Sequence, residues 1–505
     1  MNTILDLIEP ASAEADALGA PGRTPLAYGA LRALAARTGA DLNRLGIGRG
    51  DRVAIVLPNG PEMAAAFVAI ASAAASAPLN PAYRADEFEF YLNDLGARAL
   101  VVERGSASPA LEVARRLGVA VIELVPQPEA GAGAFRLDVG AHPEAGCARP
   151  GAAQPDDTAL VLHTSGTTSR PKIVPLSQRN LHASARAIAA TLAFGPADRG
   201  LNIMPLFHIH GLVAGILAPL SAGGQVFCTP GFDALRFFGW MDEARPTWYT
   251  AVPTMHQAIL ARAPRNAEVI ARHPLRFIRS SSSSLPPQVL AQLEQAFSTT
   301  VVEAYGMTEA SHQMASNPIA PGARRPGSVG LAAGPEIAIM GDDGALLPAG
   351  AVGEIVIRGE SVTAGYEANP KANAEAFRDG WFRTGDQGTL DADGFLSLTG
   401  RLKEIINRGG EKVSPREVDE VLMDHPAVAQ VVTFAMPHDK LGEDVAAAVV
   451  LREGASATER ELREFAATRV ADYKVPRKVL ILDEIPKGAT GKLQRIGLAQ
   501  KLGLA

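Results

Sequence analysis

The sequence predicts an α/β fold in which helices cover parallel sheets. Six short apolar runs have the length and composition of buried strands, and helical stretches lie between them. This alternation is typical of parallel sheets with helices on their faces. The runs predicted as strands are residues 52–57, 99–102, 120–124, 159–163, 276–279 and 300–304. The stretches predicted as helices are residues 61–75, 181–191, 235–244 and 287–297.

The pattern changes towards the C-terminal end of the chain. From about Gly327, short strands at residues 336–340, 353–358 and 395–399 are separated by Asp-Gly turns. Closely spaced strands with such turns indicate antiparallel pairing rather than helix-covered sheets. We therefore predict a β-rich subdomain over about residues 327–400.

The segment after residue 400 differs again, because it is rich in charge. It contains 17 basic and 16 acidic residues. We place a domain boundary there, which gives an N-terminal domain of residues 1–400 and a C-terminal domain of residues 401–505.

Composition and charge exclude several classes of protein. The chain of 505 residues carries 48 Lys and Arg against 54 Asp and Glu, a formal net charge of −6. This balance gives no electrostatic footprint for nucleic acid, so we expect no nucleic-acid partner. Hydrophobic residues make up 47% of the chain, which is ordinary for a globular protein and excludes extensive disorder. At about 150 residues per domain, the length corresponds to roughly three domains.

Cysteine content and hydropathy bear on the compartment. Two cysteines, Cys147 and Cys228, are too few for a disulfide framework or a CxxC metal site, which favours a reducing environment. The first residues lack a basic segment followed by an apolar one, so we expect no signal peptide. Residues 63–79 are interrupted by Pro78 and predict a buried helix running into a strand rather than a membrane span. These features predict a cytoplasmic enzyme of several domains.

The strongest motif follows the strand predicted at residues 159–163. Residues 163–172 read His-Thr-Ser-Gly-Thr-Thr-Ser-Arg-Pro-Lys and combine a glycine turn with hydroxyl and cationic side chains. Such donors on a loop are the groups that bind polyphosphate, although the spacing excludes a Walker A loop. A solvated Ser/Thr loop would have the same composition, so the interpretation depends on the remaining motifs. The candidate ligands are Thr164, Ser165, Gly166, Thr167, Thr168, Arg170 and Lys172.

Four further motifs follow along the chain. They are Glu-Ala-Tyr-Gly-Met-Thr-Glu at 303–309, Thr-Gly-Asp at 384–386, Gly-Arg-Leu-Lys-Glu at 400–404 and Pro-Lys-Gly-Ala-Thr-Gly-Lys at 486–492. In order and spacing, the five motifs resemble those of the adenylate-forming superfamily of acyl-CoA synthetases, nonribosomal adenylation domains and luciferases. The resemblance extends along nearly the whole chain.

This resemblance implies a fold and a reaction. The implied fold is a large N-terminal domain of two helix-covered sheets plus a β-barrel-like subdomain, followed by a small mobile α+β C-terminal domain. Members of the superfamily activate a carboxylate with ATP and Mg²⁺ to an acyl-adenylate and pyrophosphate, and then transfer the acyl group to a thiol. The implied small-molecule partners are therefore ATP, a carboxylic acid and CoA.

The resemblance also implies roles for single residues. Residues 165–172 would hold the β- and γ-phosphates, while Tyr305 would stack on adenine and Thr308 would contact the α-phosphate. Glu309 would hold Mg²⁺. Asp386 would accept hydrogen bonds from the ribose hydroxyls. The remaining implied roles are Arg401 beside Asp386, Lys403 as the domain hinge, Gly409 and Gly410 in the pantetheine tunnel, and Lys492 as the adenylation lysine that bridges carboxylate and α-phosphate.

Two positions depart from the superfamily pattern. Ser169 and Ile173 stand where the phosphate loop of the family usually has glycine. A serine would stiffen the loop and add a hydroxyl group. Ile173 lies outside the phosphate contacts if the loop ends at Lys172, so we expect activity to survive both changes.

The segments expected to line the acid pocket are polar. Pro-Leu-Phe-His-Ile-His-Gly at 205–211, five serines at 280–284 and His312 offer imidazole and hydroxyl groups, which suit a small, highly charged acid. Together with the other motifs they resemble oxalate–CoA ligases more closely than fatty-acyl relatives. This implies His208, Ser282 and His312 as the acid ligands. The open alternatives are ligases for malonate, short-chain or aromatic acids, and a stand-alone adenylation module that loads a carrier-protein thiol.

Overall fold

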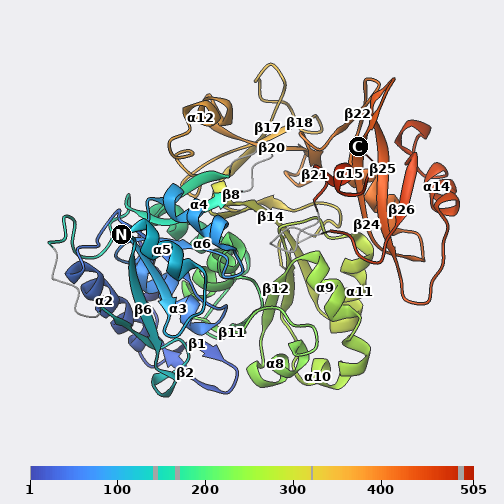
Figure 1. Ribbon diagram of the computed structural model, residues 1–505. Helices are drawn as coiled ribbons and strands as arrows, with labels where there is room; N and C mark the ends of the chain where they lie inside the picture. The colour runs from blue at the N-terminus through green and yellow to red at the C-terminus, as the bar shows by residue number, and fades with distance from the viewer. Residues whose placement is uncertain are drawn as a thin grey trace.

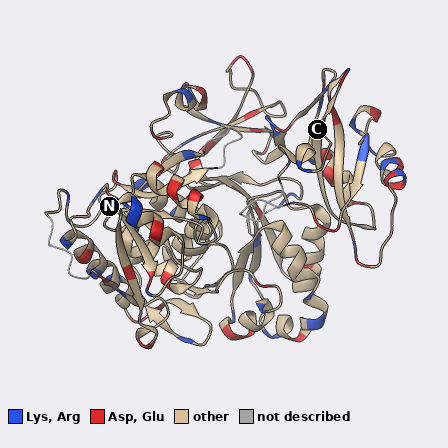
Figure 2. Ribbon diagram, in the orientation of Figure 1, with Lys and Arg blue, Asp and Glu red and all other residues tan. Residues whose placement is uncertain are grey.

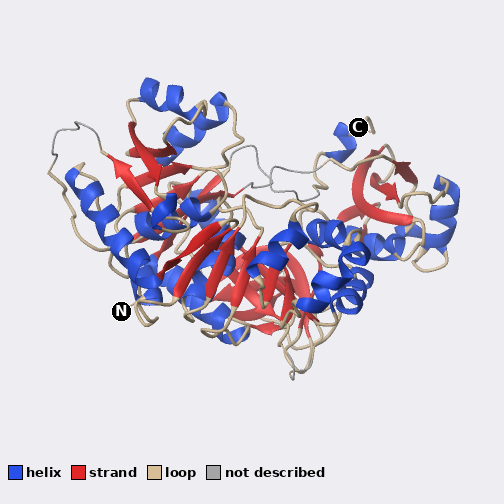
Figure 3. Ribbon diagram, turned by 90° about the horizontal axis from the view of Figure 1, so that it is seen from below, coloured by secondary structure: helices blue, strands red, loops and turns tan. Residues whose placement is uncertain are grey.

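The computed structural model describes residues 2–504, except 140–145, 165–170, 320, 321, 323 and 487–493. Within these residues the strands form four sheets, and helices cover the two larger ones (Figures 1 and 3).

The first large sheet is formed by the N-terminal third of the chain. Its strands are β3 (Arg52–Val56), β4 (Ala75–Pro78), β5 (Ala99–Glu103), β6 (Ala120–Pro126), β7 (Phe135–Asp138), β8 (Thr158–Thr164) and β9 (Lys172–Ser177). They are arranged in the order β7-β6-β5-β3-β4-β8-β9. The central pairs are parallel, whereas β7 and β9 add antiparallel edges.

The second large sheet carries the strands that end at the predicted site. Its strands are β1 (Asp16–Ala20), β2 (Arg23–Ala27), β10 (Arg199–Asn202), β11 (Gln225–Cys228), β12 (Trp248–Ala251), β13 (Phe277–Ser280), β14 (Thr300–Met307), β15 (His312–Ser316) and β16 (Leu331–Ala332). They are arranged in the order β16-β15-β14-β13-β12-β10-β11-β1-β2. The run from β10 to β14 is parallel, and β15 returns antiparallel to β14.

Two smaller sheets follow in the sequence. One is antiparallel and contains β17 (Glu336–Met340), β18 (Val352–Arg358), β19 (Phe377–Arg378), β20 (Trp381–Leu390) and β21 (Leu396–Arg401). The other contains β22 (Ile406–Arg408), β23 (Glu411–Val413), β24 (Val428–His438), β25 (Gly442–Leu451) and β26 (Lys478–Ile481).

Helices are distributed along the whole chain. The α-helices are α1 (Ile4–Ile8), α2 (Tyr28–Arg44), α3 (Pro61–Ala71), α4 (Ala85–Leu95), α5 (Ala110–Leu117), α6 (Gln178–Thr191), α7 (Ala218–Leu220), α8 (Phe237–Ala244), α9 (Pro253–Leu260), α10 (Ala267–Arg272), α11 (Pro287–Phe297), α12 (Pro370–Ala376), α13 (Pro415–Met423), α14 (Glu459–Ala467) and α15 (Leu498–Lys501). Short 3₁₀ turns are η1 (Pro128–Ala130), η3 (Ala263–Asn266), η4 (Thr308–Ala310) and η5 (Asp472–Lys474), and η2 (His210–Leu217) is a π-helix.

The main core lies between the two large sheets. Helix α3 contacts β4 of one sheet and β1 and β11 of the other, and α6 likewise contacts β8, β9 and β15. All residues of α3 except Glu62 are buried. Because half of these side chains are alanine, the two sheets can approach the helix closely on both sides.

The observed fold confirms the predicted mixed α/β class, with a large N-terminal and a small C-terminal domain. The helix predicted at 287–297 has the predicted bounds. The helix predicted at 61–75 ends at Ala71 and is followed by strand β4, in agreement with the helix running into a strand that is predicted for residues 63–79. The strand predicted at 300–304 extends to Met307 because its last four residues pair with β15.

Charge is distributed over the whole molecule. Lys and Arg alternate with Asp and Glu on helices and loops of both domains (Figure 2). Among the described residues, the helices are too short or too polar to cross a lipid bilayer.

We expect Leu181→Ala to lower the free energy of unfolding by about 2–5 kcal/mol, because its fully buried side chain would leave a cavity under α6. Leu235→Ala, at a side chain that is 72% exposed, is the matched control and should change it by less than about 0.5 kcal/mol. Urea unfolding followed by circular dichroism measures both. Equal midpoints for the two variants would contradict this assignment of the core.

Candidate active site

One group of predicted residues forms a hydrogen-bonded cluster at the carboxyl end of β14. The Tyr305 hydroxyl donates to Asp386 Oδ2 at 2.6 Å, and Arg401 Nε donates to Asp386 Oδ1 at 2.8 Å. Asp386 and Arg401 face each other because they are paired in register between β20 and β21. Burial raises the pKa of Tyr305, so its hydroxyl group remains a donor to the carboxylate. The structure thus joins three predicted nucleotide ligands from two sheets.

A second group surrounds Glu309, which lies in η4 and is 6% exposed. The Tyr366 hydroxyl donates to Glu309 Oε1 at 2.9 Å, and Lys172 Nζ lies 4.2 Å from the centre of the Tyr366 ring. Burial raises the pKa of Glu309, while the Tyr366 hydrogen bond and the Lys172 charge act in the opposite direction. Thr308, the preceding residue, is half-buried.

The predicted phosphate loop connects β8 and β9, which form an antiparallel hairpin. Thr164 and Lys172 are paired at the end of this hairpin. Ser165, Gly166, Thr167, Thr168, Ser169 and Arg170 lie outside the described residues. Ile173 is buried opposite His163 in β8 and belongs to a hydrophobic cluster, so this departure from the family pattern contributes to the core.

The predicted acid ligands meet in a buried polar cluster at the ends of β12, β13 and β15. His210 Nδ1 lies 3.0 Å from Ser282 Oγ, and His210 Nε2 lies 2.7 Å from Thr250 Oγ1. The rings of His210 and His312 are stacked, with centroids 4.8 Å apart and an interplanar angle of 19°. His208, predicted from the resemblance, contacts the cluster from its edge, where its Nδ1 accepts from the His210 amide at 3.4 Å.

Arg279 lies at the centre of this cluster and is fully buried on β13. Its guanidinium lies 3.3 Å from His210 Nε2 and 3.1 Å from His312 Nε2, and it donates to Gln313 Oε1 at 3.2 Å. Burial lowers the pKa of Arg279 to about 9, so the group is still charged at neutral pH.

The backbone around the cluster is strained. Ser282, Ser311 and His312 have φ values of 74°, 52° and 101°, in the region that side-chain-bearing residues rarely adopt. Such conformations persist where the surrounding structure imposes them, and they concentrate at ligand sites. A Cβ on Gly306 would lie 1.7 Å from the His312 carbonyl oxygen, so only glycine permits this approach of β14 and β15.

The predicted site residues after Arg401 that the structure describes lie in turns outside these clusters. Lys403 occupies the exposed turn after β21. Gly409 and Gly410 form the turn between β22 and β23, where the Gly409 amide donates to the Leu441 carbonyl at 3.0 Å. Lys492 lies outside the described residues.

Sequence reasoning missed His210, Arg279 and Tyr366 as site residues. Arg279 could have been found, because a charged residue inside a buried apolar strand is costly and therefore uncommon. His210 is the first residue of a π-helix, an element that often marks functional sites but has no clear sequence signature.

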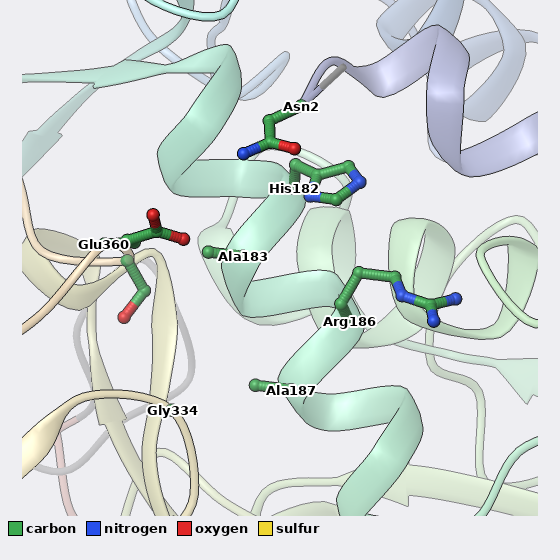
Figure 4. Close-up of a pocket in the computed structure, with 8 residues that line it drawn as sticks. Asn2, His182, Ala183, Arg186, Ala187, Gly334 and Glu360 are labelled. Carbon is green, nitrogen blue, oxygen red and sulfur yellow. The ribbon is translucent and has the colours of Figure 1, made fainter.

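A separate pocket lies beside α6 (Figure 4). It has a volume of about 440 Å³. Its lining residues are Asn2, His182, Ala183, Arg186, Ala187, Gly334, Glu360 and Ser361. None of the predicted site residues lines it, and Ser184 on the same helix donates instead to the Ser311 carbonyl beside the acid cluster.

Comparison with known proteins agrees with this geometry. Residues 11–367 match the AMP-binding enzyme model, and residues 417–492 match the AMP-binding enzyme C-terminal domain. The chain belongs to the AMP-binding enzyme family.

Its relatives cover nearly the whole chain. It is 45% identical to an oxalate–CoA ligase of Arabidopsis thaliana over 490 residues, which cover 96% of this chain and 95% of the relative. It is 43% identical to an oxalate–CoA ligase of Saccharomyces cerevisiae, over 90% of this chain and 87% of the relative. The crystal structure of ATP-bound MatB from Rhodopseudomonas palustris superposes with a TM-score of 0.88 at 29% identity, covering 100% of this chain and 98% of MatB.

Glu309 has the properties of a magnesium ligand in this AMP-binding enzyme. Mg²⁺ is usually held by one or two carboxylates together with substrate phosphates. Desolvation disfavours the ionised form of this buried carboxylate, and a nearby dication would stabilise that form. Among the described residues, no cluster of three or more His, Cys, Asp or Glu side chains forms a metal site without such phosphates.

We expect Tyr366→Phe to move the acid limit of Mg²⁺-dependent ATP binding to higher pH. Removing the hydroxyl removes a hydrogen bond to ionised Glu309, so the pKa of Glu309 rises further and the carboxylate is protonated at a higher pH. Titration calorimetry across a pH series measures the shift. Tyr249→Phe removes another buried hydroxyl, bonded to His256, and should leave the profile unchanged; an unchanged or downward-shifted limit in Tyr366→Phe would contradict the assignment.

Proposed function

We propose that this protein is an AMP-forming acid–CoA ligase whose acid substrate is oxalate. The observation that carries the proposal is the buried cluster of Arg279, His210, His312 and Ser282, which lies next to the motif of Glu309. A long acyl chain requires an apolar channel, whereas this cluster offers N–H and O–H donors and a positive charge. The similarity to two oxalate–CoA ligases supports the same substrate.

The proposed reaction has two steps. A carboxylate is a poor electrophile, so it first has to be activated. One oxalate carboxylate oxygen attacks the α-phosphate of ATP, which forms the acyl-adenylate, and pyrophosphate leaves. The thiol of CoA then attacks the carbonyl carbon of the acyl-adenylate, and AMP leaves as the thioester forms.

The nucleotide ligands follow from the first cluster. We assign the Tyr305 ring to adenine and the Asp386 carboxylate to the ribose hydroxyls, with Arg401 holding that carboxylate in place. Thr308 is assigned to the α-phosphate, and the loop between β8 and β9 to the β- and γ-phosphates. These roles rest on the match with the family motifs and on the hydrogen bonds that join Tyr305, Asp386 and Arg401.

Magnesium would be held by Glu309 and the phosphates, and would neutralise phosphate charge during the displacement. Tyr366 keeps the carboxylate oriented through its hydroxyl group, and Lys172 adds positive charge on the same side.

We assign the acid site to Ser282 and His312, as the sequence predicts, and add His210. His210 contacts Ser282 directly and stacks on His312, and His208, which the resemblance implies, accepts from the His210 amide at the edge of the same cluster. Oxalate has no methylene spacer, so ligands for its second carboxylate have to lie within a few ångströms of the reacting one. The position of His312, three residues after Glu309 in the sequence, supports this assignment.

We also propose that the domain boundary lies near residue 400 and that Lys403 is the hinge, with residues 1–400 before it and 401–505 after it. The hydrophobic clusters of the described residues support this boundary. Those of the N-terminal part end at Leu398, and those of the C-terminal part begin at Ile406.

A reducing compartment such as the cytoplasm suits this protein. Cys147 and Cys228 are both free thiols, and Cys228 is fully buried. The proposed location rests on these two residues.

Pyrophosphate release across a panel of acids tests the function. We expect oxalate to give a higher kcat/KM than malonate, butyrate or benzoate, and oxalyl-CoA to form with free CoA as the sole acceptor. Faster turnover of butyrate or benzoate would contradict the oxalate assignment. Release of pyrophosphate without any acyl-CoA product would favour a module that loads a carrier-protein thiol.

We expect Lys492→Ala to lower the rate of adenylate formation by about 10²–10³, because it removes a charge placed where phosphoryl charge develops. Thiol transfer from preformed acyl-adenylate should be unchanged. Lys487→Ala in the same motif is the matched control and should affect neither step. Rapid-quench assays of the two half-reactions measure this, and equal loss in both would contradict the role of Lys492.

A further inference from the structure

Arg279 has an unusual environment for a buried charge. Its side chain is fully buried, and the partners of its two Nη atoms are His210, Thr250, His312 and Gln313. Each of these partners is an imidazole, a hydroxyl or an amide. Across the described residues, no carboxylate pairs with this guanidinium, although buried charges in proteins are normally paired.

The neighbouring arginine on the chain shows the usual arrangement. Arg276, three residues earlier, pairs with Asp198 through both Nε and Nη2 at 3.0 Å. Arg276 lies just before β13 and is partly exposed, whereas Arg279 is fully buried within the strand and has no carboxylate partner among the described residues. The uncompensated positive charge lies at the carboxyl end of β13, where ligands bind in parallel sheets.

The guanidinium also determines the protonation of both histidines. Arginine has only N–H donors, so His210 Nε2 at 3.3 Å and His312 Nε2 at 3.1 Å have to accept. Both neutral rings therefore carry their proton on Nδ1. For His210 this places an N–H donor 3.0 Å from Ser282 Oγ.

The stacking of the two rings is consistent with this assignment. Their centroids are 4.8 Å apart, a distance at which two imidazolium charges would repel each other strongly. The positive charge of the cluster therefore resides on Arg279, and the imidazoles act as neutral donors and acceptors around it.

We propose that Arg279 is the positioning and charge-selecting residue of the acid site: it holds His210 and His312 in their Nδ1–H tautomers, and its uncompensated charge selects an acid with a second anionic group. This inference rests on the proposed function, because it concerns how the same site distinguishes oxalate from acids of one charge. Arg279 acts on the substrate through the histidines, so it is a positioning residue.

Oxamate provides the decisive probe, because it has the shape of oxalate with a neutral amide in place of the second carboxylate. We expect the wild-type enzyme to prefer oxalate by a large kcat/KM ratio in pyrophosphate release. In Arg279→Gln this ratio should fall at least tenfold, mainly through a higher KM for oxalate, while the KM for ATP stays unchanged. Arg279→Lys keeps the charge and loses the fork, so it should retain most of the ratio with lower kcat/KM for both acids.

A second measurement reports the tautomers without turnover. In protein with ¹⁵N-labelled histidine, His210 and His312 should give Nδ1–H signatures, assigned by comparison with His210→Gln and His312→Gln. Arg279→Gln should convert at least one of them to the other tautomer or to a mixture. Nε2–H signatures in the wild-type protein would overturn the positioning role. This result does not depend on whether Arg279→Gln folds.

Arg276→Gln is the matched control, since it removes an arginine of the same segment that is paired with Asp198. It should leave the oxalate-to-oxamate ratio within twofold of wild type. If the wild-type protein does not turn over oxalate, the proposed function is wrong. If it does and Arg279→Gln leaves the ratio unchanged in folded protein, only the role of Arg279 is wrong.

Discussion

The close approach of β14 and β15 is the constraint on which the rest of the site depends. It exists because residue 306 has no side chain, since a Cβ there would lie 1.7 Å from the His312 carbonyl oxygen. The turn that it permits carries Tyr305, Glu309 and His312 within eight residues of chain. Because these residues are so close in sequence, the chain itself limits the distances between the residues assigned to adenine, to magnesium and to the acid. Such fixed positioning is a large part of what an enzyme contributes to a displacement between two bound anions.

The helices and strands that could be predicted are those whose local sequence pattern is sufficient to determine them. The helix at 287–297 and the strand beginning at Thr300 are predicted at their observed positions, because apolar periodicity decides them. The five motifs likewise indicate where the nucleotide ligands lie in the sequence. The hydrogen bond between Tyr305 and Asp386 shows that two of these motifs, 81 residues apart, meet in space.

The residues that could not be predicted depend on long-range packing. Tyr366 reaches Glu309 across 57 residues of sequence and lies in none of the motifs. In the segment at 205–211, the resemblance implies His208, and the π-helix that begins at His210 also brings the His210 ring to 3.0 Å from Ser282. A π-helix has no distinctive residue pattern, so the structure was needed to add His210 to the cluster.

Among the described residues, the N-terminal and C-terminal parts have separate hydrophobic cores, so the proposed acid site lies within one part alone. Contacts between the two parts include side chains on backbone carbonyls, such as Gln257 to Ala429 and Arg416 to Leu398. They also include the polar side-chain pairs Gln288–Asp424 and Arg401–Asp386. Water can satisfy these groups when such contacts break, so separating them would cost far less free energy than exposing a core. Arg279 and its histidines all belong to the N-terminal part. The hinge that we propose at Lys403 would therefore leave the acid site intact while the turn at Gly409 moved with the C-terminal part.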